Sequence, residues 1–456
     1  MPEDTVPREV KDHEVKMAGI RGYFKNTGRV LVFICVLSFL IRLSFFIALQ
    51  PWSEKIVEGK VLVGDSSGYH MFALDILNTH SFANFDTFRT PGYPLLLAFV
   101  YSLLGIKPWI VLLLQIFMEV GLVIIVYLLS KAIFNSEQIS LIAAFLYSIN
   151  FLSAYYSVRL LTEISFTFIF ALGILFFSGG LKYNKLSGFV LGGLFVGLAT
   201  LIRPIAQYFP IVLVVVILFS SNKISQKLIN VIAVLIVFFA IISPWQFRNL
   251  ITYGYYELST ISGTGLARTS TILAKVNSEE IDRAEAKEEL VGNAFEGVTN
   301  PFEAAKIYRK IAFSYISKNP IPYAKYYFKR IVMMFLGTSR VGISDLLGIK
   351  AKPFEITEGL SLTAHKIITK FYNELPTIVL FTKQTLEYLF LIIGLAIPWT
   401  KDKKIFALLL ILIICYFAAA TGAVGYSRFR VPIVPFYLLI SAKGIYETFR
   451  RRSLRL

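Results

Sequence analysis

Long apolar runs alternate with short polar turns along most of the chain, and this pattern predicts its main elements. Ten runs are apolar enough to form membrane-spanning helices, although several are short for a hydrocarbon core of about 30 Å. They lie at residues 30–49, 109–129, 139–156, 164–177, 186–201, 205–219, 228–245, 377–399, 405–424 and 431–445. The pattern predicts an all-α polytopic membrane protein with about ten transmembrane helices, or eleven or twelve if further short runs also span.

A further apolar run at residues 92–105 is about 14 residues long and follows a proline. If it does not span, the lysine-bearing turns lie on the same side as the basic N-terminus, as the positive-inside rule requires. If it spans, every later turn is inverted. We therefore expect an interfacial or re-entrant helix, with both termini cytoplasmic. The turns in question hold Lys131, Lys182, Lys185, Lys223, Lys227 and the lysines within residues 401–404.

Residues 327–337 are basic, aromatic and apolar, and they either rest on the membrane surface or span it.

The predicted spans divide the chain into four parts. The four parts are a cytoplasmic tail at 1–29, an N-terminal transmembrane module at 30–246 with a first outer loop at 50–108, a mostly helical extracytoplasmic or interfacial segment at 247–376, and C-terminal helices with a basic tail at 377–456.

Composition excludes an ordinary soluble enzyme, because 56% of the residues are hydrophobic, only 16% are charged and the mean hydropathy is +0.65. The net charge of +17 is spread between apolar spans, which fits anionic lipid heads better than nucleic acid. Cys35 and Cys415 lie inside apolar runs, and the four histidines show no ligand spacing. We expect no disulfide and no metal site.

The turns expected on the outer side carry arginine and no lysine. Chance over a handful of turns is one explanation. The functional explanation is that the planar guanidinium group binds phosphate oxygens with two parallel hydrogen bonds, which lysine cannot do. The arginines are Arg159, Arg203, Arg248, Arg428 and Arg430.

Asp65 lies in the first outer loop, directly before a run with helical spacing. It can simply cap that helix as its N-cap residue. A carboxylate at the outer end of a helix bundle can also act as a general base. Tyr69 and His70 lie about one turn further on and can line the same cleft, although such residues are more often interface anchors.

Two more charged residues are expected near the same face. Arg89 lies just before Pro91, where the predicted interfacial helix begins, and it can bind a phosphate at head-group depth or extend to the interface. Glu163 lies at the outer start of the fourth span, where it can take part in chemistry or only complement the helix dipole.

Arg42 and Glu119 fall near mid-bilayer, at about the same depth in two different spans. Charges buried in a membrane protein normally pair. We therefore expect an ion pair between them with a structural role.

Six short motifs occur in order along the chain: GD at 64–65, RTPGYPLLLA at 89–98, TE at 162–163, LIRP at 201–204, PWQFRN at 244–249 and SRFRVPIVPF at 427–436. Together they resemble the membrane glycosyltransferases of the GT-C fold, in the branch of the protein O-mannosyltransferases and the lipid A aminoarabinose transferases. The likeness extends over about residues 30 to 445.

The resemblance implies a bundle of the GT-C type and a sugar donor carried on a polyprenyl phosphate. Asp65 would be the general base and Glu163 a second acid that orients sugar or acceptor. The donor phosphate would be held by arginines, and no metal would be needed. Arg89 stands where the aminoarabinose transferases carry a lysine. The phosphate ligands would be Arg89, Arg428, Arg430, Arg203 and Arg248, and the substrate cleft would include Tyr69, His70 and Tyr93.

The sequence thus predicts an inverting glycosyltransferase of the plasma or inner membrane, with its active site on the extracytoplasmic face. The acceptor hydroxyl belongs to a glycan, a lipid or a protein that the sequence does not identify. A transporter or flippase of lipid-linked sugars would also need outer arginines, but the internal repeats typical of transporters are not evident. A noncatalytic scaffold would not need Asp65.

Overall fold

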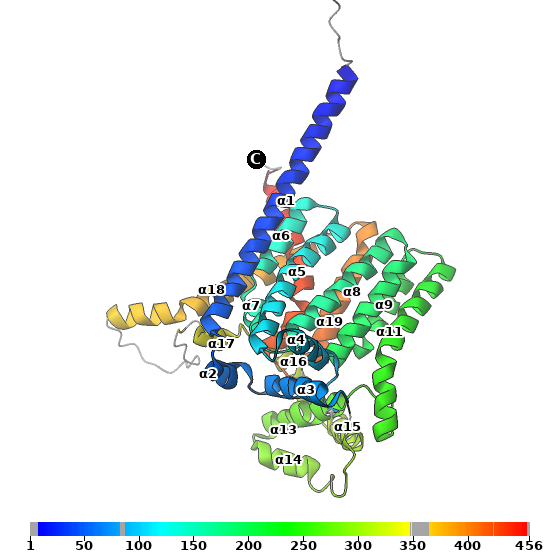
Figure 1. The fold of residues 1–456 in the computed structure, drawn as a ribbon, viewed down its shortest axis with the longest axis vertical. Coiled ribbons are helices and arrows are strands. Elements are labelled where there is room, and N and C mark those ends of the chain that lie inside the picture. Colours follow the sequence, from blue (N-terminus) through cyan, green and yellow to red (C-terminus); the bar gives the residue numbers. More distant parts are fainter. Residues whose placement is uncertain (1–7, 83–86, 347, 349–363, 423, 454–456) are drawn as a thin grey trace, which may run out of the picture.

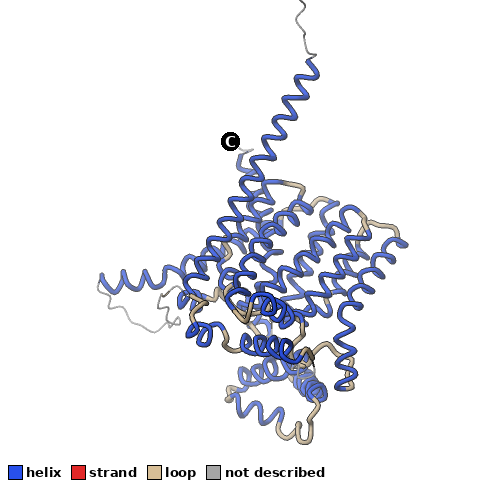
Figure 2. Tube along the Cα trace, viewed as in Figure 1, coloured by secondary structure: helices blue, strands red, loops and turns tan. Residues whose placement is uncertain are grey.

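The computed structural model describes residues 8–82, 87–346, 348, 364–422 and 424–453, and these residues form helices and loops without any strand. A bundle of long helices makes up one part of the molecule, and shorter helices gather at one end of it (Figures 1 and 2). At the opposite end, α1 extends beyond the bundle, and the end of α20 lies beside it (Figure 1). The predicted all-α class is confirmed.

Among the described residues, six helices are long and apolar enough to cross a membrane, by length and composition. Each coincides with one of the predicted spans. Their apolar segments occupy most or all of each helix, and in α1 and α18 they begin at Thr27 and Thr377. The helices are α1 (Arg8–Leu49), α5 (Pro108–Phe134), α8 (Glu163–Tyr183), α11 (Ile224–Tyr253), α18 (Ala364–Ala396) and α19 (Lys404–Thr421).

The other four predicted spans coincide with broken or shorter helices. The third is a pair, α6 (Glu137–Ser148) and α7 (Phe151–Ser157), bent by 53°. The fifth and sixth are α9 (Leu186–Ile202) and the 3-10 turn η2 (Pro204–Tyr208) followed by α10 (Pro210–Phe219). The tenth begins in the 3-10 turn η5 (Ser427–Ile433) and continues in α20 (Val434–Ser453). The count of ten spans therefore stays a prediction.

Proline sets the boundary between α9 and η2. A residue before proline is pushed out of the helical region, and Arg203 accordingly has φ −140° and ψ 117°. The helix therefore ends at Ile202. This local rule, readable in the sequence, places a guanidinium group at the end of the bundle.

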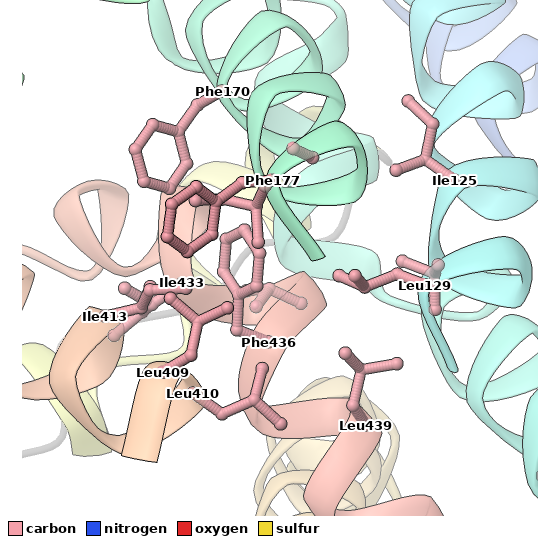
Figure 3. Packing of buried hydrophobic residues seen from close by; sticks show 14 of the residues in the cluster. Ile125, Leu129, Phe170, Phe177, Leu409, Leu410, Ile413, Ile433, Phe436 and Leu439 are labelled. Atoms are coloured by element: carbon pink, nitrogen blue, oxygen red, sulfur yellow. The ribbon is translucent and has the colours of Figure 1, made fainter. Parts of the chain in front are cut away.

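Aromatic and branched side chains from distant parts of the chain fill the centre of the bundle. Phe170 of α8 contacts Phe436 of α20 with ring centroids 5.7 Å apart, and leucines and isoleucines of α5 and α19 surround them (Figure 3). Glycines let α8, α9 and α11 approach closely: a Cβ on Gly188 would lie 2.5 Å from the backbone nitrogen of Gly180. The C-terminal helices therefore pack into the N-terminal bundle.

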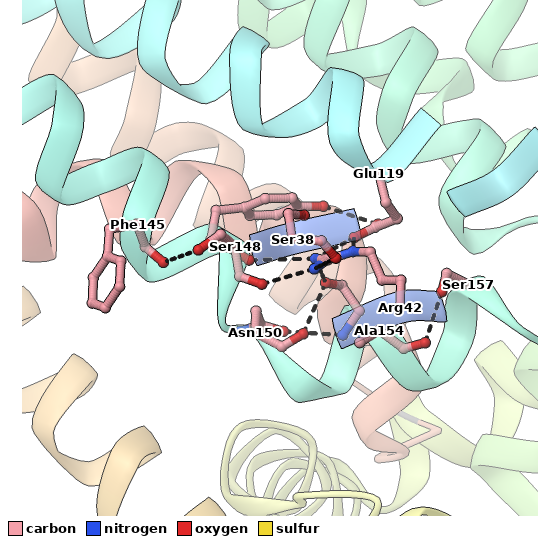
Figure 4. A network of polar contacts seen from close by, with 10 residues as sticks. Ser38, Arg42, Glu119, Phe145, Ser148, Asn150, Ala154 and Ser157 are labelled. Carbon is pink, nitrogen blue, oxygen red and sulfur yellow. Dashed lines mark hydrogen bonds and ion pairs between the residues drawn. The ribbon is translucent and has the colours of Figure 1, made fainter. Parts of the chain in front are cut away.

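Arg42 and Glu119 pair inside the bundle, as the sequence predicts. Arg42 Nη2 lies 2.7 Å from Glu119 Oε2, and both side chains are fully buried (Figure 4). The break between α6 and α7 leaves the last carbonyl groups of α6 without helical partners. Arg42 Nη1 donates to one of them, Ser148 O, at 2.7 Å. Tyr147 Oη donates to the other carboxylate oxygen at 3.0 Å. The pair therefore also stabilises the bent span.

Short helices cover one end of the bundle. The expected interfacial helix is α4 (Gly92–Leu104), whose 13 residues are too few to cross a bilayer. The first outer loop also forms α2 (Glu54–Ile56), the π-helical turn η1 (Val57–Val61) and α3 (Asp65–Thr79). The outer segment forms α12 (Ile261–Gly265), the π-helical turn η3 (Leu266–Thr271), α13 (Ile272–Glu279), α14 (Arg283–Val291), α15 (Pro301–Lys318), α16 (Pro320–Leu336) and α17 (Arg340–Leu346). A short 3-10 turn, η4 (Lys401–Lys403), precedes α19.

Candidate functional site

Asp65 opens α3 but does not cap it. Gly64 is the N-cap residue, with φ 61° and ψ −126°, a backbone conformation that suits glycine. Of the two alternatives for Asp65, the structure does not support the N-cap position. Its carboxylate instead faces two arginines: Arg428 Nη2 lies 3.0 Å from Oδ2, and Arg89 Nη2 lies 3.6 Å from Oδ1. Because 41% of the Asp65 side chain remains exposed, a substrate can still reach it.

Arg89 is held among aromatic rings. Its guanidinium carbon lies 5.2 Å from the ring centre of Tyr69 and 5.8 Å from that of Phe88, within the range of cation–π attraction. On the other side stands Gly68, where a Cβ would come within 2.9 Å of the guanidinium carbon. The lack of a side chain at Gly68 therefore makes room for Arg89 beside α3.

Glu163 is the first residue of α8 and is fully buried. Its Oε1 accepts from Arg203 Nη1 at 2.6 Å and from Arg428 Nε at 2.9 Å. Its other oxygen, Oε2, is buried and has no hydrogen-bond partner among the described residues. A buried carboxylate oxygen normally has a partner, so Oε2 can accept a hydrogen bond from a substrate hydroxyl.

Arg428 joins the two acids. It lies in η5, between α19 and α20, and its guanidinium carbon is 5.1 Å from the ring centre of Phe429. The carboxylate of Glu163, and then that of Asp65, raise the pKa of Arg428 above its ordinary value although burial opposes this. Arg203 lies against the same ring, with its guanidinium carbon 5.4 Å from the centre of Phe429.

The five charges form one alternating row: Arg89, Asp65, Arg428, Glu163 and Arg203. With three cations and two anions, the row has an excess of one positive charge. It can therefore bind an anion such as a phosphate while keeping a carboxylate beside it. The row joins residues from the segment before α4, from the start of α8 and the end of α9, and from the C-terminal part.

Gly92 brings two of these segments together. A Cβ at this first residue of α4 would lie 2.7 Å from the backbone carbonyl of Leu201. The start of α4 therefore packs directly on the end of α9. Arg89 precedes this contact and Arg203 follows it, so the contact fixes both arginines near the same place.

Of the residues predicted to line the substrate cleft, Tyr69 lies beside the row, against Arg89. Burial, together with the nearby charges of Glu163 and Asp65, raises the pKa of its hydroxyl, although Arg203 opposes this. Its ring meets that of Tyr93 edge-on, with centroids 5.2 Å apart. Tyr93 donates to Gln115 and His70 Nδ1 lies 3.0 Å from Tyr101 Oη, so both have protein partners away from the charges.

Two predicted phosphate ligands, Arg430 and Arg248, have partners other than Asp65 and Glu163. Arg430 donates to the carbonyls of Met334 and Phe335 at the end of α16 and to Gln384 Oε1. Arg248 donates to Phe82 O at 2.5 Å. No ion pair links these two arginines to Asp65 or Glu163 among the described residues. A phosphate role for these two stays a prediction.

Aromatic partners of the arginines were not predicted. Phe429 separates Arg428 from Arg430 in the sequence, and Phe88 directly precedes Arg89. These neighbours are the signal that could have identified them, because aromatic faces hold guanidinium groups at fixed positions. Within the described ranges, no group of three histidine, cysteine or acidic side chains is arranged to hold a metal ion.

Part of the chain matches a known protein family. Residues 89–247 match the family model described as dolichyl-phosphate-mannose-protein mannosyltransferase. This part holds Arg89, Glu163 and Arg203, but neither Asp65 nor Arg428. No curated protein matches the chain.

Among solved structures, the archaeal oligosaccharyltransferase AglB from Archaeoglobus fulgidus, in complex with an inhibitory peptide and a dolichol-phosphate, aligns over 95% of this chain. Its TM-score is 0.54 at 15% sequence identity, and this chain spans 52% of its length. ArnT from Cupriavidus metallidurans, bound to undecaprenyl phosphate, aligns over 92% of this chain and 78% of its own, with 11% identity and a TM-score of 0.41.

The fold and the family match together indicate the class of membrane protein. The protein is an integral, multi-pass membrane protein with the fold of the GT-C glycosyltransferases, as the sequence resemblance predicts. Its match to the mannosyltransferase model is confined to the module that carries most of the charged row.

Proposed function

We propose that the protein is an inverting glycosyltransferase that moves a sugar from a polyprenyl phosphate to an acceptor hydroxyl. One observation carries this proposal: an exposed carboxylate, Asp65, lies between two arginines at the end of a membrane bundle. The family model matched by residues 89–247 describes enzymes that use a lipid phosphate sugar, which supports the same reaction.

Asp65 is the general base in this proposal. As the acceptor oxygen attacks the anomeric carbon, its proton passes to the carboxylate, and the bond between that carbon and the phosphate oxygen breaks. The electron pair of the broken bond leaves with the polyprenyl phosphate. Since the acceptor attacks opposite to the leaving group in a single displacement, the configuration at the carbon inverts.

The arginines stabilise the leaving group. The polyprenyl phosphate gains negative charge as the bond breaks, and fixed guanidinium groups bind that charge more strongly in the transition state than in the ground state. Arg428 and Arg89 contact Asp65 directly, so a phosphate bound to them lies beside the base. Glu163 Oε2 is placed to accept a hydrogen bond from the sugar or the acceptor. The reaction so drawn uses no metal.

The site is proposed to face the extracytoplasmic side, in a plasma or inner membrane with both termini cytoplasmic. The short helices α3 and α4, which carry or follow the residues of the charged row in the first outer loop, lie at one end of the bundle, and the end of α20 lies at the other (Figure 1). The lysine-bearing turns lie at the same end of the bundle as the end of α20, which supports a cytoplasmic position for that end of the bundle. The acceptor is an unidentified glycan, lipid or protein.

The test is turnover by purified protein in liposomes. Polyprenyl-phosphate mannose and other polyprenyl-phosphate sugars are supplied with a mixture of acceptors, and released polyprenyl phosphate is measured. Asp65→Asn should lower release by a factor of about 10² to 10⁴, the range for loss of a general base. Asp75→Asn, on the same helix α3, is the matched control and should keep full activity.

Two outcomes would contradict the proposal. Release that persists in folded Asp65→Asn protein would remove the base from the mechanism. Movement of the lipid-linked sugar between leaflets without release of polyprenyl phosphate would favour the flippase. Mass spectrometry of the cell-envelope glycans of a deletion strain would then identify the sugar and the acceptor.

A further inference from the structure

A second hollow lies in the outer segment, apart from the charged row. This groove is shallow and open to solvent, and its volume is about 590 Å³. One wall is the loop that follows α11 and the other is α15. The lining residues are Tyr255, Glu257, Lys306, Arg309, Lys310 and Phe313.

The two walls of the groove are tied together. Arg309 of α15 donates twice to Glu257, at 2.8 Å and 2.7 Å. Asn300 caps α15 by accepting from Phe302 N, and its side-chain amide donates to Tyr253 O at the end of α11 at 2.8 Å. Direct hydrogen bonds and an ion pair therefore hold the two walls of the groove together.

The groove carries unbalanced positive charge. Glu257 neutralises Arg309, but Lys306 and Lys310 have no acidic partner within the described part of the chain. These two lysines stand one turn apart on the exposed side of α15, so their ammonium groups face the same region. An anionic ligand with one or two negative charges complements this surface.

Exposed aromatic residues place the groove at head-group depth. Tyr256 contacts Phe247 of the spanning helix α11, with ring centroids 5.2 Å apart, and both are exposed. Phe313 inside the groove is 62% exposed, and Tyr208 in η2 is 61% exposed. Aromatic side chains concentrate in this way where a membrane protein meets the bilayer surface.

The length of α11 agrees with this depth. Its 30 residues extend about 45 Å, which exceeds a hydrocarbon core of about 30 Å. If its first residues start near the cytoplasmic surface, its last turns reach the outer head groups. The loop with Tyr255 and Glu257 follows directly, so the groove opens where lipid phosphates lie.

We propose that this groove binds the phosphate head group of an anionic phospholipid from the surrounding bilayer. Lys306 and Lys310 contact the phosphate, and Phe313 lies along the glycerol and upper acyl chain. The proposal is independent of the transfer reaction. The bound lipid would hold the outer segment against the membrane, where Thr260 N donates to Thr87 O at 2.9 Å, two residues before Arg89.

Native mass spectrometry of the full-length protein tests this proposal. The protein is released from nanodiscs of phosphatidylcholine with increasing amounts of phosphatidylglycerol, and bound lipids are counted. The double variant Lys306→Gln with Lys310→Gln should bind phosphatidylglycerol more weakly by about a factor of five for each lysine, as expected for lysines near an anionic surface. Replacing both by arginine should restore binding.

The control variant Arg283→Gln with Lys287→Gln removes the same charge from exposed positions of α14, outside the groove. It should bind phosphatidylglycerol like the wild type. Equal retention by the wild type and the groove variant would overturn the proposal. So would preferential retention of polyprenyl phosphate, or of a soluble acidic oligosaccharide, in competition with phosphatidylglycerol at this groove.

Discussion

Arg428 Nη2 lies 3.0 Å from Asp65 Oδ2, although 363 positions separate the two residues in the chain. Asp65 comes from the first outer loop and Arg428 from the turn before α20. The contact therefore requires that the C-terminal helices pack against the N-terminal bundle. It also places the proposed base and a proposed phosphate ligand in one row.

Glu163→Gln should destabilise the protein. Removing this charge leaves Arg203 and Arg428 partly buried without their shared carboxylate, which costs about 3 to 5 kcal/mol for a broken buried pair. Thermal unfolding followed by tryptophan fluorescence measures the change. Glu303→Gln, in the first turn of α15, is an exposed control and should leave the unfolding temperature nearly unchanged. An unfolding temperature of Glu163→Gln equal to that of the wild type would argue against the shared ion pair.

Arg42 and Glu119 should behave as a coupled pair. Either Arg42→Gln or Glu119→Gln leaves one uncompensated buried charge, at a cost of about 3 to 5 kcal/mol. The double variant has no such charge, so it should be more stable than the sum of the single changes predicts. A double-mutant cycle of unfolding free energies in detergent measures the coupling. Simple addition of the two effects would show that the pair does not matter.

Arg430→Lys should reduce stability more than it affects donor binding. The guanidinium group of Arg430 donates to two carbonyls at the end of α16 and to Gln384, and one ammonium group cannot reproduce this geometry. Arg428→Lys should instead raise the KM for the lipid donor. Comparing unfolding temperature and KM for both variants separates the two roles. A raised KM with unchanged stability in Arg430→Lys would restore its predicted phosphate role.

His70 should make the protein less stable in acid. Burial lowers the pKa of its imidazole below the ordinary value of 6.5, so between the two values the unfolded chain binds more protons than the folded one. Stability is therefore lost as the pH falls from about 6.5 towards the lower folded pKa. Unfolding temperatures measured from pH 8 to pH 5 should fall less in His70→Gln. The same pH dependence in both proteins would exclude His70 as its source.

The sequence by itself determined the class of the fold. Apolar runs between lysine-bearing turns predicted all ten helical regions, and the need to pair buried charges predicted the contact of Arg42 with Glu119. The span predicted at residues 186–201 also agrees with the end of α9 at Ile202, which leaves Arg203 in the turn where the sequence placed it. Such predictions succeed because the bilayer and the local backbone act on each segment separately.

Only the tertiary structure decided which of the candidate residues meet. Arg428 and Arg430 are two positions apart, yet Arg428 contacts Asp65 and Glu163 while Arg430 is directed to the end of α16. Asp65 resembled a helix cap in the sequence, but Gly64 holds that position and frees the carboxylate for two arginines. The physical reason is that side-chain direction and long-range packing depend on how distant helices fit together, which no short stretch of sequence encodes.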